Sequence, residues 1–155
     1  MHMGEAMVRS AEEVLRGNPA TTHYALGFIV CGEWVLLIRK QRPTWQKGRL
    51  NGVGGHVEPG ETYLEALIRE VKEEVGIETR PEEWRHFATL EGKDYRCLCF
   101  VAESERIFQA RAMTDEVPGI YYVHNLTEQA LPSVRYLVPM ALDQDLKKPV
   151  TLVYR

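Results

Sequence analysis

Three glutamates in the middle of the chain have the spacing of a metal-binding or acid–base group. Glu70, Glu73 and Glu74 lie three and four residues apart, so a helix would bring their carboxylates onto one arc of its surface. Carboxylates gathered in this way repel one another, whereas Mg²⁺ binds such oxygens and keeps waters that a phosphate substrate can replace. The alternative is a glutamate-rich helix face exposed to solvent, and three glutamates alone do not exclude it.

A helix that begins after Thr62 would position these glutamates. Thr62 is predicted to cap its start, Glu65 completes a capping box, and Gly76 predicts its end. The core-facing stripe is predicted from apolar residues at helical spacing, which are Leu64, Leu67, Ile68, Val71 and Val75.

Residues 54–77 also resemble the Nudix hydrolase signature at each position that the signature constrains. The matching residues are Gly55, Glu61, Arg69, Glu70, Val71, Glu73, Glu74, Gly76 and Ile77. Matches of this length rarely arise by chance. The resemblance implies an α/β/α sandwich with a mixed central sheet, and hydrolysis of a diphosphate linkage in a nucleotide.

The resemblance also implies the ligands of a metal ion. Helix carboxylates hold Mg²⁺ or Mn²⁺ in the family, so Glu70, Glu73 and Glu74 are the expected ligands here. A backbone carbonyl of the glycine-rich loop joins them in the family, and its position falls at Gly54.

The catalytic set of the motif includes two further charged residues, and the general base stays open. Glu61 and Arg69 are better interpreted as a structural pair that ties the loop to the helix. Glu70 is one candidate base. Glu116 is another, because the family often places a glutamate just before this later strand, and Asp115 could replace it. Asp115 and Glu116 could also be simple turn residues.

The run before the signature resembles that of oxidised-purine nucleoside triphosphatases within the superfamily. An asparagine matching Asn51 contacts the purine there, and a tryptophan commonly stands where this chain has Leu50. Two adjacent aspartates that read the base in eukaryotic members fall at Ser133 and Val134, so base identity stays open. Trp45 could stack on a base or cover a core edge, and Arg39 could bind phosphate or be a solvated charge.

The expected function is therefore hydrolysis of a nucleoside triphosphate to nucleoside monophosphate and pyrophosphate, as in housekeeping of the nucleotide pool. The alternative is a pyrophosphatase for ADP-ribose, another nucleoside diphosphate derivative or a dinucleotide. A non-catalytic Nudix-fold binding module is disfavoured because every signature glutamate is present. A helix that only binds a structural ion is a further alternative.

The composition is that of one soluble domain spanning residues 1–155, with residues 1–20 as a peripheral segment. The chain is 45% hydrophobic and 26% charged with net charge −3, and it has neither a basic stripe nor a membrane-spanning apolar run. We therefore expect a small nucleotide substrate, no nucleic-acid polymer, no membrane and a possible homodimer. Three cysteines, Cys31, Cys97 and Cys99, match no zinc spacing and no secretory signal precedes them, which indicates buried thiols in the cytoplasm.

Apolar and turn patterns predict the remaining elements. A hairpin is expected over residues 21–40, with further strands at 84–90, 95–102, 120–123 and 150–154. Residues 5–17 could form a short helix, 103–115 should be irregular, and 126–131 could form a helical turn. Ser133 could cap a final helix through Leu146 that Pro139 bends or shortens.

Overall fold

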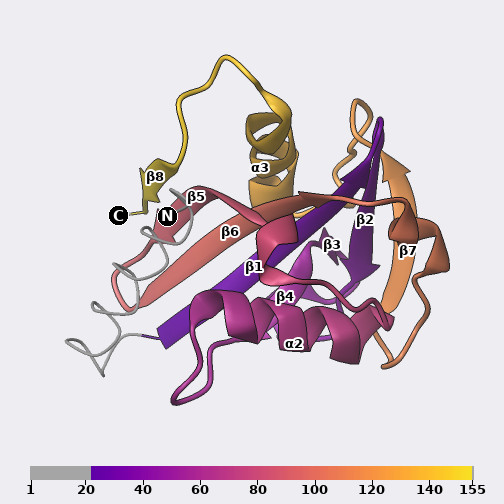
Figure 1. Ribbon diagram of the computed structural model, residues 1–155, viewed down its shortest axis with the longest axis horizontal. Coiled ribbons are helices and arrows are strands. Elements are labelled where there is room, and N and C mark those ends of the chain that lie inside the picture. Colours follow the sequence, from indigo (N-terminus) through magenta and orange to yellow (C-terminus); the bar gives the residue numbers. More distant parts are fainter. Residues whose placement is uncertain (1–21, 155) are drawn as a thin grey trace.

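The computed structural model describes residues 22–154, in which one mixed sheet lies between two helices (Figure 1). Its eight strands run in the order β3-β2-β1-β6-β5-β8, with β4 also pairing with β1 and β7 with β2. They are β1 (Thr22–Cys31), β2 (Trp34–Arg39), β3 (Leu50–Asn51), β4 (Val53–His56), β5 (Arg85–Glu91), β6 (Tyr95–Glu103), β7 (Val117–Tyr122) and β8 (Val150–Val153). The predicted α/β fold with a mixed sheet is confirmed.

The predicted hairpin is formed by β1 and β2, which pair antiparallel with Val30 opposite Val35. On its other side, β1 pairs in parallel with β6 from Thr22 to Val30, so it lies in the middle of the sheet. Strands covered on both faces need apolar side chains on both, and β2 is buried from Val35 to Ile38.

The helices α2 (Tyr63–Val75) and α3 (Pro132–Leu142) cover opposite faces of the sheet (Figure 1). Alternate side chains of β2 divide between the two layers. Leu36 packs in one core cluster with Leu67 of α2, whereas Leu37 packs in the other with Leu137 of α3. The result is the α/β/α arrangement that the family resemblance implies.

The predicted caps of α2 are present, and Leu67, Val71 and Val75 of the expected stripe are fully buried, but the buried face extends to one side of that stripe. Thr62 and Glu65 form the capping box, and Gly76 ends the helix in the left-handed conformation with φ 73°. Leu64 and Ile68 are only partly buried, whereas Tyr63 and Ala66 are fully buried. The helix is therefore rotated so that Glu74 falls within its buried stripe.

At residues 126–131 no helix forms, but a single turn does, in which the Ala130 N–H donates to the Thr127 carbonyl over 3.0 Å. The end of this turn pairs with β3: Leu50 N–H donates to the carbonyl of Gln129 over 2.8 Å, and Leu131 N–H donates to that of Leu50 over 3.0 Å. α3 then begins at Pro132 rather than after Ser133, because proline lacks the N–H that a first helical position leaves unpaired. It ends at Leu142, where the exposed polar residues 143–145 offer no apolar face to bury.

Other differences from the expected elements are small. Strands β3 and β4 were not predicted, since glycines interrupt the apolar pattern, and η3 (Glu105–Gln109) lies in the segment expected to be irregular. β7 begins three residues earlier than expected and contains Pro118, which an edge strand tolerates. Cys97 and Cys99 are buried thiols as expected, and Cys31 is half-buried.

The helix predicted at residues 5–17 lies outside the described residues. Within residues 22–154, no helix combines the length and the apolar character needed to cross a membrane.

Candidate active site

Arg69 holds the glycine-rich loop against the first turns of α2. Its Nε and Nη2 donate to the two carboxylate oxygens of Glu61 over 2.7 and 2.9 Å. Nη2 also donates to the backbone carbonyl of His56 over 3.1 Å. Because the Arg69 hydrogen bonds favour the charged form more than burial disfavours it, the pKa of Glu61 is lowered. The structure thus contains the pair that was expected to tie loop to helix.

Glu73 lies on the outer side of the glutamate group. Its side chain is 57% exposed, and Oε2 accepts a hydrogen bond from Arg69 Nη1 over 3.3 Å. The same nitrogen donates to Glu70 Oε1 over 3.0 Å. Arg69 therefore relieves part of the expected repulsion without a metal ion, and it directs Glu73 away from the buried side of the helix.

Glu70 lies directly against the glycine-rich loop. A Cβ placed on Gly55 would be 2.6 Å from Glu70 Oε1, which is closer than a Cβ approaches a non-bonded atom in real structures. Only glycine leaves room for this carboxylate beside β4. The loop sequence therefore fixes where the Glu70 side chain can lie.

Glu74 is the buried member of the group. The residue is 8% exposed, and its Oε2 has no hydrogen-bond partner. Burial, followed by the hydrogen bond with the neighbouring Glu70 carboxylate, raises the pKa of Glu74 to about 9. Without a cation, this pair of carboxylates therefore holds a proton at neutral pH.

Glu116 reaches the same region from the segment before β7. Its carboxylate accepts hydrogen bonds from Lys40 Nζ over 2.9 Å and from the Gln41 N–H over 2.7 Å. Burial alone would raise the pKa of Glu116, but these donors outweigh it and the pKa is lowered. Both Lys40 and Glu116 act electrostatically on Glu74, so the two carboxylates belong to one site.

A short segment ahead of Glu116 is attached to the end of α2. The N–H of Arg111 donates to the carbonyl of Val75 over 3.1 Å, and that of Met113 donates to the carbonyl of Glu74 over 3.3 Å. Residues 110–116, here called the strap, thereby use carbonyls that the last helical turn leaves unpaired. The strap brings Glu116 to the helix that carries Glu70 and Glu74.

The donor set fits a hard divalent cation. Glu70 and Glu74 lie together, and one of their oxygens is buried without a partner, which is the environment that a cation would complete. Across residues 22–154, no three His, Cys, Asp or Glu side chains are already arranged around a common point. Of the expected carboxylate ligands, Glu70 and Glu74 are thus brought together, and Glu73 pairs with Arg69.

Gly54 has a structural reason of its own to be glycine. A Cβ at this position would lie 2.0 Å from the backbone oxygen of Ala25 in β1. The close pairing of β4 with β1 therefore excludes any larger residue, whether or not the Gly54 carbonyl binds a metal ion.

The residues expected to bind substrate are distributed around β3 and its neighbours. Asn51 accepts from the Gly52 N–H over 2.8 Å and donates to Gln46 Oε1 over 3.3 Å. Trp45 lies in η1 (Thr44–Gln46) with 70% of its surface exposed, so it does not cover a core edge. Arg39 is used within the fold, since its nitrogens donate to the Gly48 carbonyl and to Gln129 Oε1.

Lys40 and Arg42 were predicted only as members of a basic run, with Arg39, Lys47 and Arg49, in which some side chains could bind phosphate or be solvated charges. Lys40 is the partner of Glu116, and Arg42 pairs with Asp115 over 2.5 Å. The clustering of basic residues at the end of β2 was the feature of the sequence that indicated a role for them. Their partners are more than seventy residues away in the chain, so the sequence does not indicate which cation meets which carboxylate.

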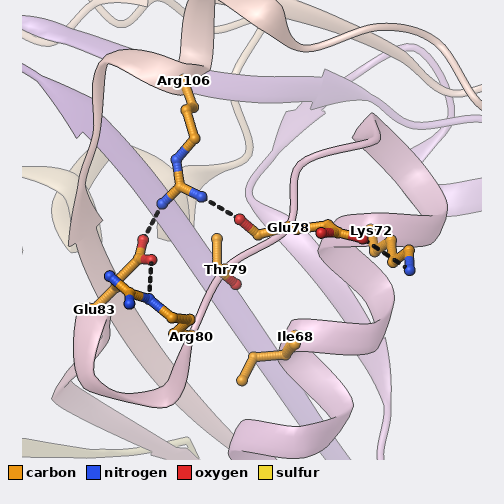
Figure 2. Close-up of a pocket in the computed structure, with 7 residues that line it drawn as sticks. All are labelled: Ile68, Lys72, Glu78, Thr79, Arg80, Glu83 and Arg106. Atoms are coloured by element: carbon orange, nitrogen blue, oxygen red, sulfur yellow. Dashed lines mark hydrogen bonds and ion pairs between the residues drawn. The ribbon is translucent and has the colours of Figure 1, made fainter.

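A separate pocket of about 480 Å³ lies on the other side of α2 (Figure 2). Its helical residues, Ile68 and Lys72, are two positions from Glu70 and Glu74 and therefore face the opposite way. Figure 2 shows Arg106 reaching both the Glu78 carbonyl and Glu83. The cations of this pocket are neutralised by its own acidic groups, so it is distinct from the carboxylate site.

Comparison with known proteins decides the family. The family model of the NUDIX domain matches residues 21–136. The chain belongs to the Nudix family. Its similarity to the NAD-capped RNA hydrolase NudC of Pseudomonas entomophila is 41% identity over 66 residues, covering 43% of this chain and 23% of that protein. The NudC of Stutzerimonas stutzeri is 30% identical over 125 residues, covering 76% of this chain and 43% of the relative. The chain spans less than half the length of these relatives.

Solved Nudix structures share the fold. A MutT structure from work on Aliivibrio salmonicida and Vibrio cholerae superposes with a TM-score of 0.62 at 20% identity, covering 77% of this chain and 98% of that one. A NUDIX hydrolase from Clostridium perfringens gives a TM-score of 0.63 at 20% identity over 81% and 99% of the two chains. The predicted Nudix resemblance and fold are therefore confirmed.

Proposed function

We propose that this Nudix protein is a divalent-metal-dependent pyrophosphohydrolase that converts a nucleoside triphosphate to nucleoside monophosphate and pyrophosphate. The observation that carries the proposal is the buried Glu70–Glu74 pair, with its unpartnered oxygen, beside the Lys40–Glu116 pair. Anionic phosphates cannot approach this acidic site unless a cation neutralises it. The same cation would be shared by the substrate.

Glu70 and Glu74 would hold Mg²⁺ or Mn²⁺, joined by Glu73 once it leaves Arg69 and by the Gly54 carbonyl. When bound, the ion neutralises phosphate charge and lowers the pKa of water. Glu116 has a lowered pKa and is ionised at neutral pH, so it can accept a proton from the attacking water. Glu70 is the other candidate base.

Water and the nucleotide are the only reactants of the proposed hydrolysis. The water oxygen forms a bond to one phosphorus, the anhydride bond to that phosphorus breaks, and the bonding electrons leave with the departing phosphate oxygen. The proton of the water passes to the carboxylate base. Lys40 keeps Glu116 charged and oriented through their 2.9 Å contact.

Three residues are proposed to contact the rest of the nucleotide. Trp45 offers an exposed indole face on which a base can stack. The Asn51 amide can donate and accept on a base edge, although its present partners are Gln46 and Gly52. Arg39 would have to exchange the Gly48 carbonyl or Gln129 for a phosphate oxygen.

A second candidate is hydrolysis of a dinucleotide or another nucleoside diphosphate derivative, such as ADP-ribose. It is favoured by the curated relatives, which are named NAD-capped RNA hydrolases. The carboxylate site would be the same, because it acts on the diphosphate. A homodimer and a cytoplasmic location fit either candidate and remain proposals.

A hydrolysis panel with Mg²⁺ and with Mn²⁺ separates the two candidates. It contains canonical dNTPs and NTPs, 8-oxo-dGTP, ADP-ribose, NADH, a diadenosine polyphosphate and an NAD-capped RNA, with pyrophosphate and phosphate detected separately. Pyrophosphate release from triphosphates alone supports the proposal. Turnover of NADH or capped RNA with inert triphosphates transfers support to the second candidate. The Glu74→Gln variant is the control for contaminating hydrolases.

A further inference from the structure

Arg42 and Asp115 form an ion pair at the outer edge of the carboxylate site. Arg42 Nη2 lies 2.5 Å from Asp115 Oδ2, and Nη1 lies 4.0 Å from Glu116 Oε2. The Arg42 and Asp115 side chains are 62% and 59% exposed, whereas Glu116 is 7% exposed. The guanidinium is therefore on the solvent side of a carboxylate that faces the buried Glu74.

The three cations near the site differ in how firmly they are held. Arg69 is committed to carboxylates and a backbone carbonyl on several sides. Lys40 is largely buried against Glu116. Arg42 alone among these three is itself exposed, at 62% against 25% for Arg69 and 15% for Lys40, and its partner Asp115 is exposed as well. Pairs of exposed charges contribute little to stability. It is the cation that can exchange partners at least cost.

The backbone of Arg42 is anchored independently of its side chain. Its N–H donates to Glu116 Oε2 over 3.4 Å, and the neighbouring Gln41 N–H donates to the same oxygen over 2.7 Å. The guanidinium can therefore turn away from Asp115 while the contacts that hold Glu116 stay in place. A movement of this kind changes the mouth of the site and leaves the buried carboxylates undisturbed.

We propose that Arg42 is a substrate-binding residue whose guanidinium leaves Asp115 and takes the phosphate chain of the incoming nucleotide. A planar guanidinium suits this exchange, because it can bind two phosphate oxygens as it binds a carboxylate. Asp115 then competes with the substrate for Arg42. This inference rests on the proposed function and assigns Asp115 a role different from that of a general base.

The test compares Arg42→Ala, Asp115→Ala and the double variant. KM and kcat are measured on the best triphosphate, and the dissociation constant is measured by calorimetry for a non-hydrolysable α,β-imido-dGTP with Mg²⁺. Arg42→Ala should raise KM and the dissociation constant about tenfold with little change in kcat. Asp115→Ala should lower the dissociation constant, because Arg42 is then free to bind phosphate. In the Arg42→Ala background, adding Asp115→Ala should leave the dissociation constant unchanged.

A pair that only stabilises the loop gives a different pattern, in which both single variants weaken binding alike. That result, or an unchanged dissociation constant in Arg42→Ala, overturns the proposal. Arg80→Ala removes an arginine of similar exposure that also pairs with carboxylates, but away from the site, and it should leave KM unchanged. Thermal unfolding of each variant confirms that it is folded.

The outcome stays separate from that of the proposed function. If the wild-type protein releases no pyrophosphate from any triphosphate, the proposed function fails. The same variants are then compared by calorimetric binding of inorganic tripolyphosphate with Mg²⁺. Opposite effects of the two single substitutions still support a phosphate-binding Arg42, and equal effects or no binding overturn it.

Discussion

The carboxylate of Glu70 occupies the space that any side chain on Gly55 would need, since a Cβ there would lie 2.6 Å from Oε1. The two residues come from β4 and α2, so the glycine-rich loop and the helix meet at this contact. Glycine is needed at this position because the Glu70 carboxylate occupies the space of a side chain. The backbone turn does not itself require glycine.

We therefore predict that Gly55→Ala lowers kcat roughly a hundredfold, because displacing a catalytic group by about 1 Å has effects of this size. The atom that must move ends a flexible side chain, so the melting temperature should change little. Gly54→Ala is the contrasting variant. Its Cβ would meet the backbone of Ala25 at 2.0 Å, and it should lose about 1–3 kcal/mol of stability. Equal melting temperatures for the two variants would contradict this distinction.

Glu74 should make the metal-free protein less stable as pH rises. Its pKa is about 9 in the folded protein against an ordinary value of 4.5, so the folded state binds more protons than the unfolded state between these values. The free energy of unfolding should then fall with increasing pH across this window, by an amount on the order of a few kcal/mol. Glu74→Gln should remove this decline in urea unfolding measured with EDTA.

The same substitution should lower turnover by several orders of magnitude while the fold persists, and Glu73→Gln should do likewise if Glu73 leaves Arg69 to bind the ion. Mg²⁺ should raise the melting temperature of the wild-type protein and have less effect on either variant. Glu78→Gln changes an exposed glutamate outside the site and is the matched control. Near-normal turnover in Glu74→Gln would refute the proposed metal ligands.

Arg69→Lys should loosen the loop and the helix together. A lysine retains the charge but cannot make the two parallel hydrogen bonds to Glu61, so the free energy of unfolding should fall by about 1–3 kcal/mol. Combining it with Glu61→Gln in a double-mutant cycle should show strong coupling in chemical denaturation. Additive effects would mean that the pair does not act as a unit.

His86 should make the fold sensitive to acid. Burial lowers the pKa of His86 to about 4 from 6.5 and outweighs the opposing hydrogen bond that Nε2 donates to the Ala88 carbonyl, while Nδ1 is buried without a hydrogen-bond partner. The unfolded state binds the extra proton below pH 6.5, so roughly 3 kcal/mol of stability is lost as pH falls from 6.5 to 4. His86→Gln should be less stable at neutral pH but lose less on acidification, as denaturant midpoints at several pH values would reveal.

The local signals in the sequence were sufficient for α2, because Thr62, Glu65 and Gly76 specify its ends through contacts within a few residues. The centre of the buried face of α2, at Leu67, Val71 and Val75, was predicted, but its edges were not. They depend on how Tyr63 and Ala66 pack against the sheet, and this packing decides that Glu74 is buried while Glu73 is exposed. Apolar periodicity alone placed the edge of the stripe too far from the glutamates.

Contacts between distant segments were beyond the sequence patterns. Lys40 and Glu116 are separated by 76 residues, and nothing in either neighbourhood indicates the other. The pairing of Leu50 with residues 129–131 was missed for the same reason, since a local pattern can predict a turn there but not the strand that the turn meets. Contacts within a few residues of one another were predictable from the sequence. Contacts between distant residues, such as Lys40 with Glu116, depend on the order of the strands in the sheet.

The strap has a consequence for how this protein could be diversified. Its hydrogen bonds to the Glu74 and Val75 carbonyls fix the position of Glu116 relative to α2, the helix that carries Glu70 and Glu74. Residues 104–109, between β6 and the strap, do not make these two hydrogen bonds. Within η3, Ile107 is buried in the core cluster of α2 and Arg106 binds Glu83, so both must be kept. Exchanges at the exposed residues Glu105, Phe108 and Gln109 can therefore vary the surface of this segment while the spacing of Glu70, Glu74 and Glu116 is kept.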